Sequence, residues 1–336
     1  MKKILSLAIV TALCSAMTFT AFAGEAVQNT ETTVTIAAMN GPTGMGMAYL
    51  NRQSDEGNTQ YKYDISYASS PDEITGELIS GQIDIAAVPV NLASVLYNKT
   101  EGQLLTAAVN TLGVLYIVEN GETVNSMADL AGKKILASGM GSTPEYVLSY
   151  LLEANGLTDQ VEVEYAADHD EAVTAMLNGT ADLIMIPEPK VSAVLAQCEG
   201  ARIAVDMTAE WNNVYAAVDG SDAETVPELV QGVIVVQKAF AEEHSDILEA
   251  FLAEYAESVE YTNSNIEDAA QLIEDYGIVG KAAIAVKAIP NCNIVCLTGD
   301  DMETAVSEML SVLYNANPQS VGGTLPGAEM FYSAEE

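Results

Sequence analysis

Residues 81–97 read GQIDIAAVPVNLASVLY, and this stretch decides the fold class. Residues 83–88 form a short apolar run, typical of a strand that is buried on both faces, and residues 91–97 have the pattern of a helix. A buried strand that leads directly into a helix is the building unit of parallel sheets. The stretch therefore predicts an α/β protein.

The same alternation continues in both directions along the chain. The predicted strands are at 33–38, 61–67, 83–88, 104–108 and 112–118. The rhythm then restarts, with strands at 134–137, 161–165 and 183–186. Helices are predicted at 45–51, 71–80, 91–97, 126–130, 144–155, 171–177 and 191–198. Two such alternations imply two lobes, each built on a parallel sheet.

The last third of the chain does not repeat this rhythm. It has one strand, at 233–236, followed by long helices at 243–258, 265–276 and 302–316. We expect these helices to pack back on the first lobe, so that the chain crosses between the lobes twice, near 115–119 and near 212–234. Two crossings make a hinge, and a hinged cleft clamps a ligand. The expected division is a signal peptide at 1–23, the first part of lobe 1 at 24–117, lobe 2 at 118–215 and the second part of lobe 1 at 216–336.

The first 23 residues have the features of a signal peptide. Lys2 and Lys3 precede an apolar stretch, and Ala21-Phe22-Ala23 supplies the small-x-small pattern of a cleavage site. The alternative is a retained membrane anchor, for which the stretch is only marginally long enough. Cys14 is a candidate for lipid attachment, but Leu13 is larger than the residue that such processing favours. We expect an extracytoplasmic protein that is secreted, periplasmic or bound to the cell surface.

The composition is that of an acidic, globular chain. Its 336 residues include 12 basic and 48 acidic ones, which gives a net charge of −36. Nucleic acid requires clusters of basic residues, and an anionic membrane surface repels such a charge, so neither is an expected partner. An excess of acidic residues is typical of a soluble surface.

Three cysteines lie outside the predicted signal peptide, at Cys198, Cys292 and Cys296. An odd number does not make a disulfide framework. If residues 292–297 form a strand, Cys292 and Cys296 lie about 13 Å apart, which is too far for a disulfide. No histidine lies near them to complete a zinc site, so we expect these cysteines to be structural and mostly buried.

Two turns between a strand and a helix carry small and hydroxyl residues. In an open parallel sheet, ligands bind beyond the carboxyl ends of the strands, where helix N-termini present free N–H groups and glycine lets a ligand approach the backbone. Each turn alone fits an ordinary capped turn slightly better, but one turn in each lobe favours a shared cleft. The candidate ligand-binding residues are Asn40, Gly41, Pro42, Thr43 and Gly44 in the first turn, and Gly139, Gly141, Ser142 and Thr143 in the second.

Two further loops occupy equivalent places in the two lobes. Pro89, Val90 and Asn91 follow the strand at 83–88, and Asn91 could cap a helix or contact a ligand. Glu188 lies between two prolines, which hold it extended, and we expect it to point into the mouth of the cleft. The alternative for Glu188 is a solvated carboxylate on a rigid turn. All four residues join the candidate ligand-binding set.

No catalytic, metal or cofactor site is predicted. The chain has only two histidines, His169 and His244, and the segment Asp168-His169-Asp170 lacks further ligands at a useful spacing. No Gly-x-Ser-x-Gly elbow is present. Among 48 acidic residues some carboxylates always form pairs, so a pair does not indicate acid–base chemistry.

The order and spacing of several segments carry a resemblance to a known family. The segments are 81–97, 126–156 with SMADLAGKKI and GMGSTPE, 178–190 (NGTADLIMIPEPK) and 233–251 (VIVVQKAFAEEHSDILEAF). Together they resemble the substrate-binding proteins of ABC importers in the nitrate, sulfonate and taurine group, which also includes binders of thiamine precursors. The resemblance covers nearly all of 33–336, and residues 290–332 are similar to a clostridial branch of the group.

The resemblance implies a type II periplasmic-binding-protein fold, with two Rossmann-like lobes joined by a two-strand hinge and extra C-terminal helices on lobe 1. It implies a monomeric, non-enzymatic receptor that captures a small anionic or heteroaromatic molecule and delivers it to an ABC permease. Arg52 and Arg202, the arginines beyond the signal peptide, fall outside the predicted cleft turns, which argues against a bidentate contact to sulfonate or nitrate. Two alternatives stay open. One is an enzyme on the same fold, of the pyrimidine-precursor synthase or menaquinone-pathway type, and the other is a ligand sensor for a membrane receptor.

Overall fold

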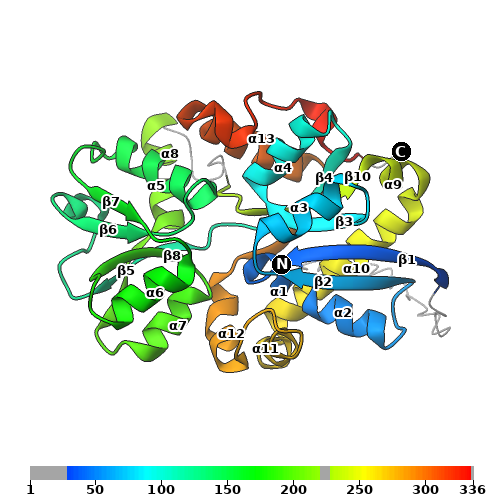
Figure 1. Cartoon of the computed structure of the whole chain (residues 1–336), viewed down its shortest axis with the longest axis horizontal. Helices are drawn as coiled ribbons and strands as arrows, with labels where there is room; N and C mark the ends of the chain where they lie inside the picture. The colour runs from blue at the N-terminus through cyan, green and yellow to red at the C-terminus, as the bar shows by residue number, and fades with distance from the viewer. Residues whose placement is uncertain (1–28, 220–227, 334–336) are drawn as a thin grey trace, which may run out of the picture.

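The computed structural model describes residues 29–219 and 228–333, so the predicted signal peptide and Cys14 lie outside it. The described chain forms two sheets, each covered by helices (Figure 1). The six-stranded sheet contains, in spatial order, β11 (Ile294–Leu297), β4 (Leu104–Thr111), β10 (Gly232–Gln237), β3 (Ile85–Pro89), β1 (Asn29–Met39) and β2 (Tyr61–Ala68). The five-stranded sheet contains β7 (Glu162–Tyr165), β6 (Lys134–Ala137), β8 (Leu183–Pro187), β5 (Leu115–Asn120) and β9 (Ala201–Asp206). The prediction of two α/β lobes is confirmed. Lobe 1 contains the six-stranded sheet and lobe 2 the five-stranded sheet.

The sequence predicted parallel sheets, but both sheets are mixed, with parallel and antiparallel pairs of strands. β1 runs parallel to β2 and β3, and β6 runs parallel to β7 and β8. β10 is antiparallel to β3 and β4, β11 is antiparallel to β4, and β5 is antiparallel to β8 and β9. β5 and β10 each follow a passage from the other lobe. Each therefore enters its sheet from the end at which the parallel strands finish, and it runs in the opposite direction to them.

Helices cover both faces of each sheet. In lobe 1, the buried residues of one face pack against α1 (Pro42–Met45), α2 (Ala48–Asp55), α9 (Lys238–Glu243), α10 (Ser245–Ser264), α11 (Ile266–Asp275) and α12 (Ala282–Ala288). The other face packs against α3 (Pro71–Ile79), α4 (Val90–Lys99) and α13 (Gly299–Ala316). In lobe 2, η1 (Met127–Leu130), α5 (Thr143–Ala154) and α8 (Met207–Asp219) cover one face, and α6 (His169–Leu177) and α7 (Lys190–Gln197) cover the other. Short 3-10 turns follow at η3 (Ile289–Asn291), η4 (Pro318–Val321) and η5 (Ala328–Met330).

The two lobes share part of their apolar core. α13 contacts β4 and α4 in lobe 1 and also α5 in lobe 2. One cluster of buried side chains therefore continues from Met309 and Leu313 of α13 to Leu148 and Trp211 on the lobe 2 side. A second contact between the lobes joins α12 and α7. The C-terminal helices thus pack on lobe 1, as expected, and also reach lobe 2.

The first passage between the lobes lies at 112–114, slightly before the predicted 115–119, because β5 belongs entirely to the second sheet. The predicted boundary at residue 117 falls inside this strand. A Cβ atom on Gly113 would lie 2.0 Å from Thr208 Oγ1, so this passage requires glycine. The second passage runs from α8 to β10, and residues 220–227 within it lie outside the described residues.

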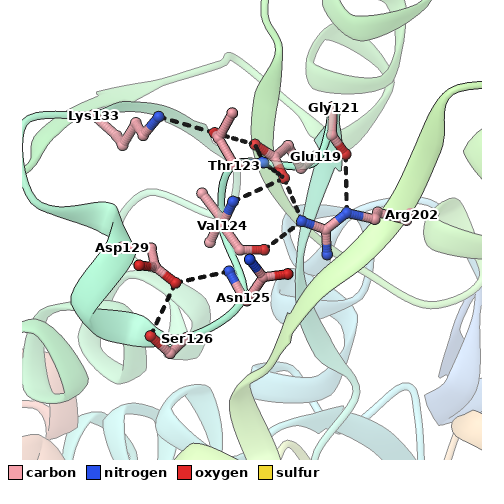
Figure 2. Close-up of polar contacts among 9 residues, drawn as sticks. All are labelled: Glu119, Gly121, Thr123, Val124, Asn125, Ser126, Asp129, Lys133 and Arg202. Atoms are coloured by element: carbon pink, nitrogen blue, oxygen red, sulfur yellow. Dashed lines mark hydrogen bonds and ion pairs between the residues drawn. The ribbon is translucent and has the colours of Figure 1, made fainter.

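A partly buried ion pair holds the far end of lobe 2 together (Figure 2). Arg202 Nη2 lies 2.6 Å from Glu119 Oε2, and Arg202 Nε donates to the carbonyl of Gly121. The Glu119 carboxylate also accepts hydrogen bonds from the backbone N–H groups of Thr123 and Val124. Burial opposes ionisation of Glu119, but the hydrogen bond from the Thr123 hydroxyl, these N–H bonds and the Arg202 charge lower its pKa below the ordinary value. The loop after β5 is therefore tied to β9 by charge.

We expect Arg202→Met to destabilise the chain by about 1–3 kcal/mol at pH 7, because it removes a charged hydrogen-bond donor from the buried Glu119 carboxylate, which keeps its bonds from Thr123 and Val124. The double variant Glu119→Gln/Arg202→Met removes both charges and should lose clearly less. Urea unfolding of the three proteins measures this. Since the folded-state pKa of Glu119 is lowered, its contribution is present above the unfolded-state pKa and is lost as the pH falls through the folded-state value. A double variant as unstable as Arg202→Met would contradict the role of the ion pair.

Candidate functional site

A hydrogen bond between the lobes joins two of the predicted site residues. Thr143 Oγ1, in the first turn of α5, donates to Asn91 Oδ1, in the first turn of α4, at 3.2 Å. Both side chains are buried. α4 follows β3 and α5 follows β6, so the two helices begin where strands of opposite lobes end. The structure therefore brings the Asn91 loop and the second predicted turn together.

The first predicted turn faces the loop after β8. Gly41 has a φ of 88°, a conformation that favours glycine, and its carbonyl accepts from the N–H groups of Gly44 and Met45 at the start of α1. A Cβ atom on Gly41 would lie 3.7 Å from Pro189 Cδ of lobe 2. Beside it, Asn40 donates to Ser69 Oγ, while its Oδ1 is buried and accepts no hydrogen bond from the described residues. The turn thus contributes to the surface between the lobes.

The second turn is closed by its own side chains. Ser142 occupies the N-cap position of α5, but its hydroxyl donates back to the Gly139 carbonyl at 2.7 Å and caps no N–H group. The N–H of Gly141 donates to Glu145 Oε2 at 2.5 Å. A carboxylate of the chain therefore already occupies the place where an anionic ligand would accept from this turn.

The sequence predicted that Glu188 points into the mouth of a cleft, but its side chain is folded back against its own lobe. It is 1% exposed, and its carboxylate folds back to accept from the N–H and the hydroxyl of Ser192 in α7, both at 3.0 Å. The Asn291 amide, from lobe 1, lies 3.5 Å from Glu188 Oε1. Burial raises the pKa of Glu188, and the hydrogen bonds from Ser192 and Asn291 offset this only in part. This fold-back is possible because the N–H of Ser192, in the first turn of α7, has no hydrogen-bond partner within the helix and can donate to Glu188.

Three polar residues at the lobe junction were missed by the sequence analysis. Asn110, at the end of β4, donates to the Thr43 carbonyl at 2.9 Å and lies against Gly232 at the start of β10. Gln231 Nε2 and Thr208 Oγ1 are buried and have no hydrogen-bond partner among the described residues. Gln231 is next to the site, because its carbonyl accepts from the N–H of Val90. Only Asn110 carried a signal in the sequence, because it is a polar residue at the end of an apolar strand.

Both arginines are engaged away from these residues. Arg202 pairs with Glu119, and Arg52 lies over the rings of Tyr49 and Tyr261, 4.9 and 5.4 Å from their centroids. The candidate site residues described above offer amide, hydroxyl and backbone groups, together with the carboxylates of Glu145 and Glu188. This arrangement suits hydrogen bonding to a ligand that carries little net negative charge.

No arrangement for metal or covalent chemistry emerges from the described part of the chain. It contains no group of three or more metal-ligating side chains, and its three cysteines are free, with Cys292 buried and Cys198 and Cys296 partly so. The imidazole of His169 lies 2.7 Å from the buried Ser138 hydroxyl. Burial, followed by the nearby Lys190 charge, lowers the pKa of His169. Within the same residues no helix has the length and apolar character to cross a membrane.

Glu188→Gln should leave stability unchanged or raise it at pH 7, because Gln keeps an acceptor for Ser192 and removes a charge that burial disfavours. Since the folded-state pKa of Glu188 is raised, the charge costs stability as the pH rises through that value, and the cost vanishes below the unfolded-state pKa. The difference from wild type should therefore shrink towards pH 4. Glu188→Ala loses the hydrogen bonds and should cost about 1–3 kcal/mol. Thermal unfolding against pH measures both, and a Gln variant as unstable as Ala at pH 7 would show that the negative charge itself is required.

The comparisons with known proteins agree with this fold. The model of a family described as "ABC transporter, phosphonate, periplasmic substrate-binding protein" matches residues 44–287. No protein among the curated sequences matches the chain. Similar solved structures include an ABC transporter protein from Parabacteroides distasonis, with a TM-score of 0.74 and 22% identity over 90% of this chain and 100% of that one. The periplasmic aliphatic sulphonate binding protein SsuA from Escherichia coli has a TM-score of 0.69 and 17% identity over 90% and 93%.

The periplasmic nitrate-binding protein NrtA from Synechocystis PCC 6803 is a more distant match, with a TM-score of 0.59 and 10% identity over 86% of this chain and 84% of that one. At these identities the solved structures establish the type II periplasmic-binding-protein fold, which confirms the predicted fold class. The family match spans well over half of the chain. The chain therefore belongs to the family of periplasmic substrate-binding proteins of phosphonate ABC transporters.

Proposed function

We propose that this substrate-binding protein is a non-enzymatic receptor that captures its ligand between the two lobes and delivers it to an ABC permease. The observation that carries the proposal is the buried hydrogen bond from Thr143 in lobe 2 to Asn91 in lobe 1. It supports a ligand site at the place where the first turns of α4 and α5 meet. The passage at 112–114 and the passage from α8 to β10 would be the two connecting segments of the hinge.

The ligand that we propose is a small, uncharged heteroaromatic molecule with both donor and acceptor groups. Three buried polar atoms favour it, namely Asn40 Oδ1, Thr208 Oγ1 and Gln231 Nε2, because a buried polar group without a partner costs free energy until one arrives. Gln231 would donate to the ligand, and Asn40 would accept from it. The carboxylates of Glu145 and Glu188 disfavour an anion at the same place.

A phosphonate or sulfonate is the second candidate. The description of the matched family favours it, and so do the names of the solved relatives. Without an arginine, such an oxyanion would depend on amides, hydroxyls and N–H groups, and Glu145 would have to release the N–H of Gly141. A neutral ligand therefore leaves the hydrogen bond from Gly141 to Glu145 intact, whereas an oxyanion at this turn requires that bond to break.

We further propose that the chain is exported by cleavage after residue 23, without lipid at Cys14, and acts as a monomer. Candidate ligand contacts also include Pro42, Thr43, Gly44, Pro89, Val90 and Gly139, which lie on the same turns. Ser142 and Glu188 would act by holding the turn and α7 in place.

The proposal predicts one stabilising ligand class in a thermal-shift screen of residues 24–336. The panel contains pyrimidine and thiamine precursors, riboflavin, methylphosphonate, alkanesulfonates, nitrate and amino acids. A ligand at about 100 times its Kd adds about 2.7 kcal/mol of stability. Stabilisation by a neutral heteroaromatic compound supports our assignment, whereas stabilisation by an oxyanion alone overturns it in favour of the second candidate. If no compound stabilises the chain and denatured protein releases no small molecule, the receptor proposal itself is wrong.

Variants then test the location. Thr143→Val and Gln231→Leu should each weaken binding of the stabilising ligand about tenfold or more, because each removes one hydrogen bond in a buried place. Thr174→Val, on the exposed side of α6, is the matched control and should bind like wild type. Isothermal calorimetry measures all three. If Thr143→Val and Gln231→Leu both bind the ligand as tightly as wild type does, the ligand lies elsewhere.

A further inference from the structure

A pocket separate from the candidate site lies where helices of both lobes meet. It has a volume of about 650 Å³ and is lined by the second half of α5, by α8 and by the C-terminal end of α13. α5 and α8 belong to lobe 2, while α13 packs on β4 and α4 of lobe 1. None of the predicted ligand-binding residues lines it. Its volume is in the range of small-molecule sites. We refer to it as the α5–α8–α13 pocket.

The electrostatic character of this pocket is negative. Glu153 of α5 and Glu210 of α8 line it, and neither forms an ion pair within the described chain. None of the described lining residues is lysine or arginine. Two helices also end in its wall, α5 at Ala154 and α13 at Ala316, and neither has a basic residue in its last turn. Helix C-termini carry partial negative charge, so carboxylates and helix dipoles act in the same direction.

Two aromatic side chains also line the same pocket. Tyr150 and Tyr215 line it, and their rings are stacked at 5.9 Å. Trp211 is fully buried and packs on both, at 5.1 and 5.2 Å. Burial raises the pKa of Tyr215, so its phenol stays neutral. The faces of electron-rich rings attract organic cations, and quaternary ammonium groups most characteristically.

We infer that the α5–α8–α13 pocket binds a small organic ammonium ion, as a second ligand site of this protein. Two glutamates, the C-terminal ends of two helices and two tyrosines line one cavity, and this combination suits an alkylammonium group better than an anion or a neutral molecule. A cation held there contacts helices of both lobes at once. The inference is independent of the ligand proposed between Asn91 and Thr143, since the two sites share no residue.

The test uses choline and its neutral carbon analogue, 3,3-dimethyl-1-butanol, which has the same shape without the charge. Trp211 is the only tryptophan of the chain and packs on both pocket tyrosines, so its fluorescence senses changes at this site through their rings. We expect a saturable change in Trp211 fluorescence with choline, and binding of the neutral analogue weaker by roughly tenfold or more. Equal binding of the two compounds, or no saturable change with choline, overturns the inference.

Variants separate the pocket from general attraction of cations to an acidic chain. Glu153→Gln and Glu210→Gln should each weaken choline binding several-fold. Glu249→Gln, at an exposed position on α10, removes the same charge away from the pocket and should leave binding unchanged. A loss with Glu249→Gln as large as with the pocket variants means that only the net charge matters, and the inference fails. Thermal unfolding of the three variants shows that each is folded.

Discussion

The candidate site depends on the way in which the chain passes between its two sheets. At 112–114 the chain leaves β4 and enters β5, and at Gly113 it passes so close to Thr208 that no side chain fits. Asn293 ties the passage down, because its side chain donates to the Gly113 carbonyl and its own carbonyl accepts from the N–H of Leu112. This narrow passage makes β5 run antiparallel to its neighbours. It also turns the carboxyl ends of the parallel strands in both lobes towards one another.

The chemistry of the site follows from this geometry. When strand ends of both lobes face each other, the turns that follow them meet, and Asn91 reaches Thr143. The same junction buries Thr208 Oγ1 of α8, which lies against the first passage at Gly113, and Gln231 Nε2, at the end of the second passage. The charged side chains nearby are used within the fold, since Glu145 closes its own turn and Glu188 holds the start of α7. The junction therefore presents mainly neutral hydrogen-bonding groups, which is why we propose an uncharged ligand although the family match names phosphonate.

Much of the fold could be predicted from the sequence, because the apolar strands and the helices after them have clear periodicity. β3, β6 and β8 were located within a few residues, and so were α4, α5 and α13. β9, α8 and α12 were not predicted. β9 is an edge strand with Arg202 and Asp206 in it, and most of its residues are only half-buried, so it lacks an apolar run. The helix expected at 45–51 is instead two helices, since the chain bends between Met45 and Ala48, where a Cβ on Gly46 would lie 2.7 Å from the Tyr255 hydroxyl.

The turns at the lobe junction could be located from the sequence, but their contacts could not. Glycine, serine and threonine after a buried strand marked two turns that lie at this junction, yet no local pattern reveals that the Ser142 hydroxyl donates back to Gly139 or that Ser192 binds the Glu188 carboxylate. Those contacts depend on residues that tertiary packing brings together. Gln231 and Thr208 were missed for the same reason, since their burial results from the passages between the lobes.

Small-angle X-ray scattering of residues 24–336, with and without a saturating amount of the ligand that stabilises the chain most, tests the central claim most directly. If the ligand binds between the lobes and the two passages act as a hinge, the radius of gyration falls when the ligand is added, and it falls less for Thr143→Val at the same ligand concentration. An unchanged radius of gyration, at a ligand concentration that saturates binding, would contradict closure of the lobes on the ligand.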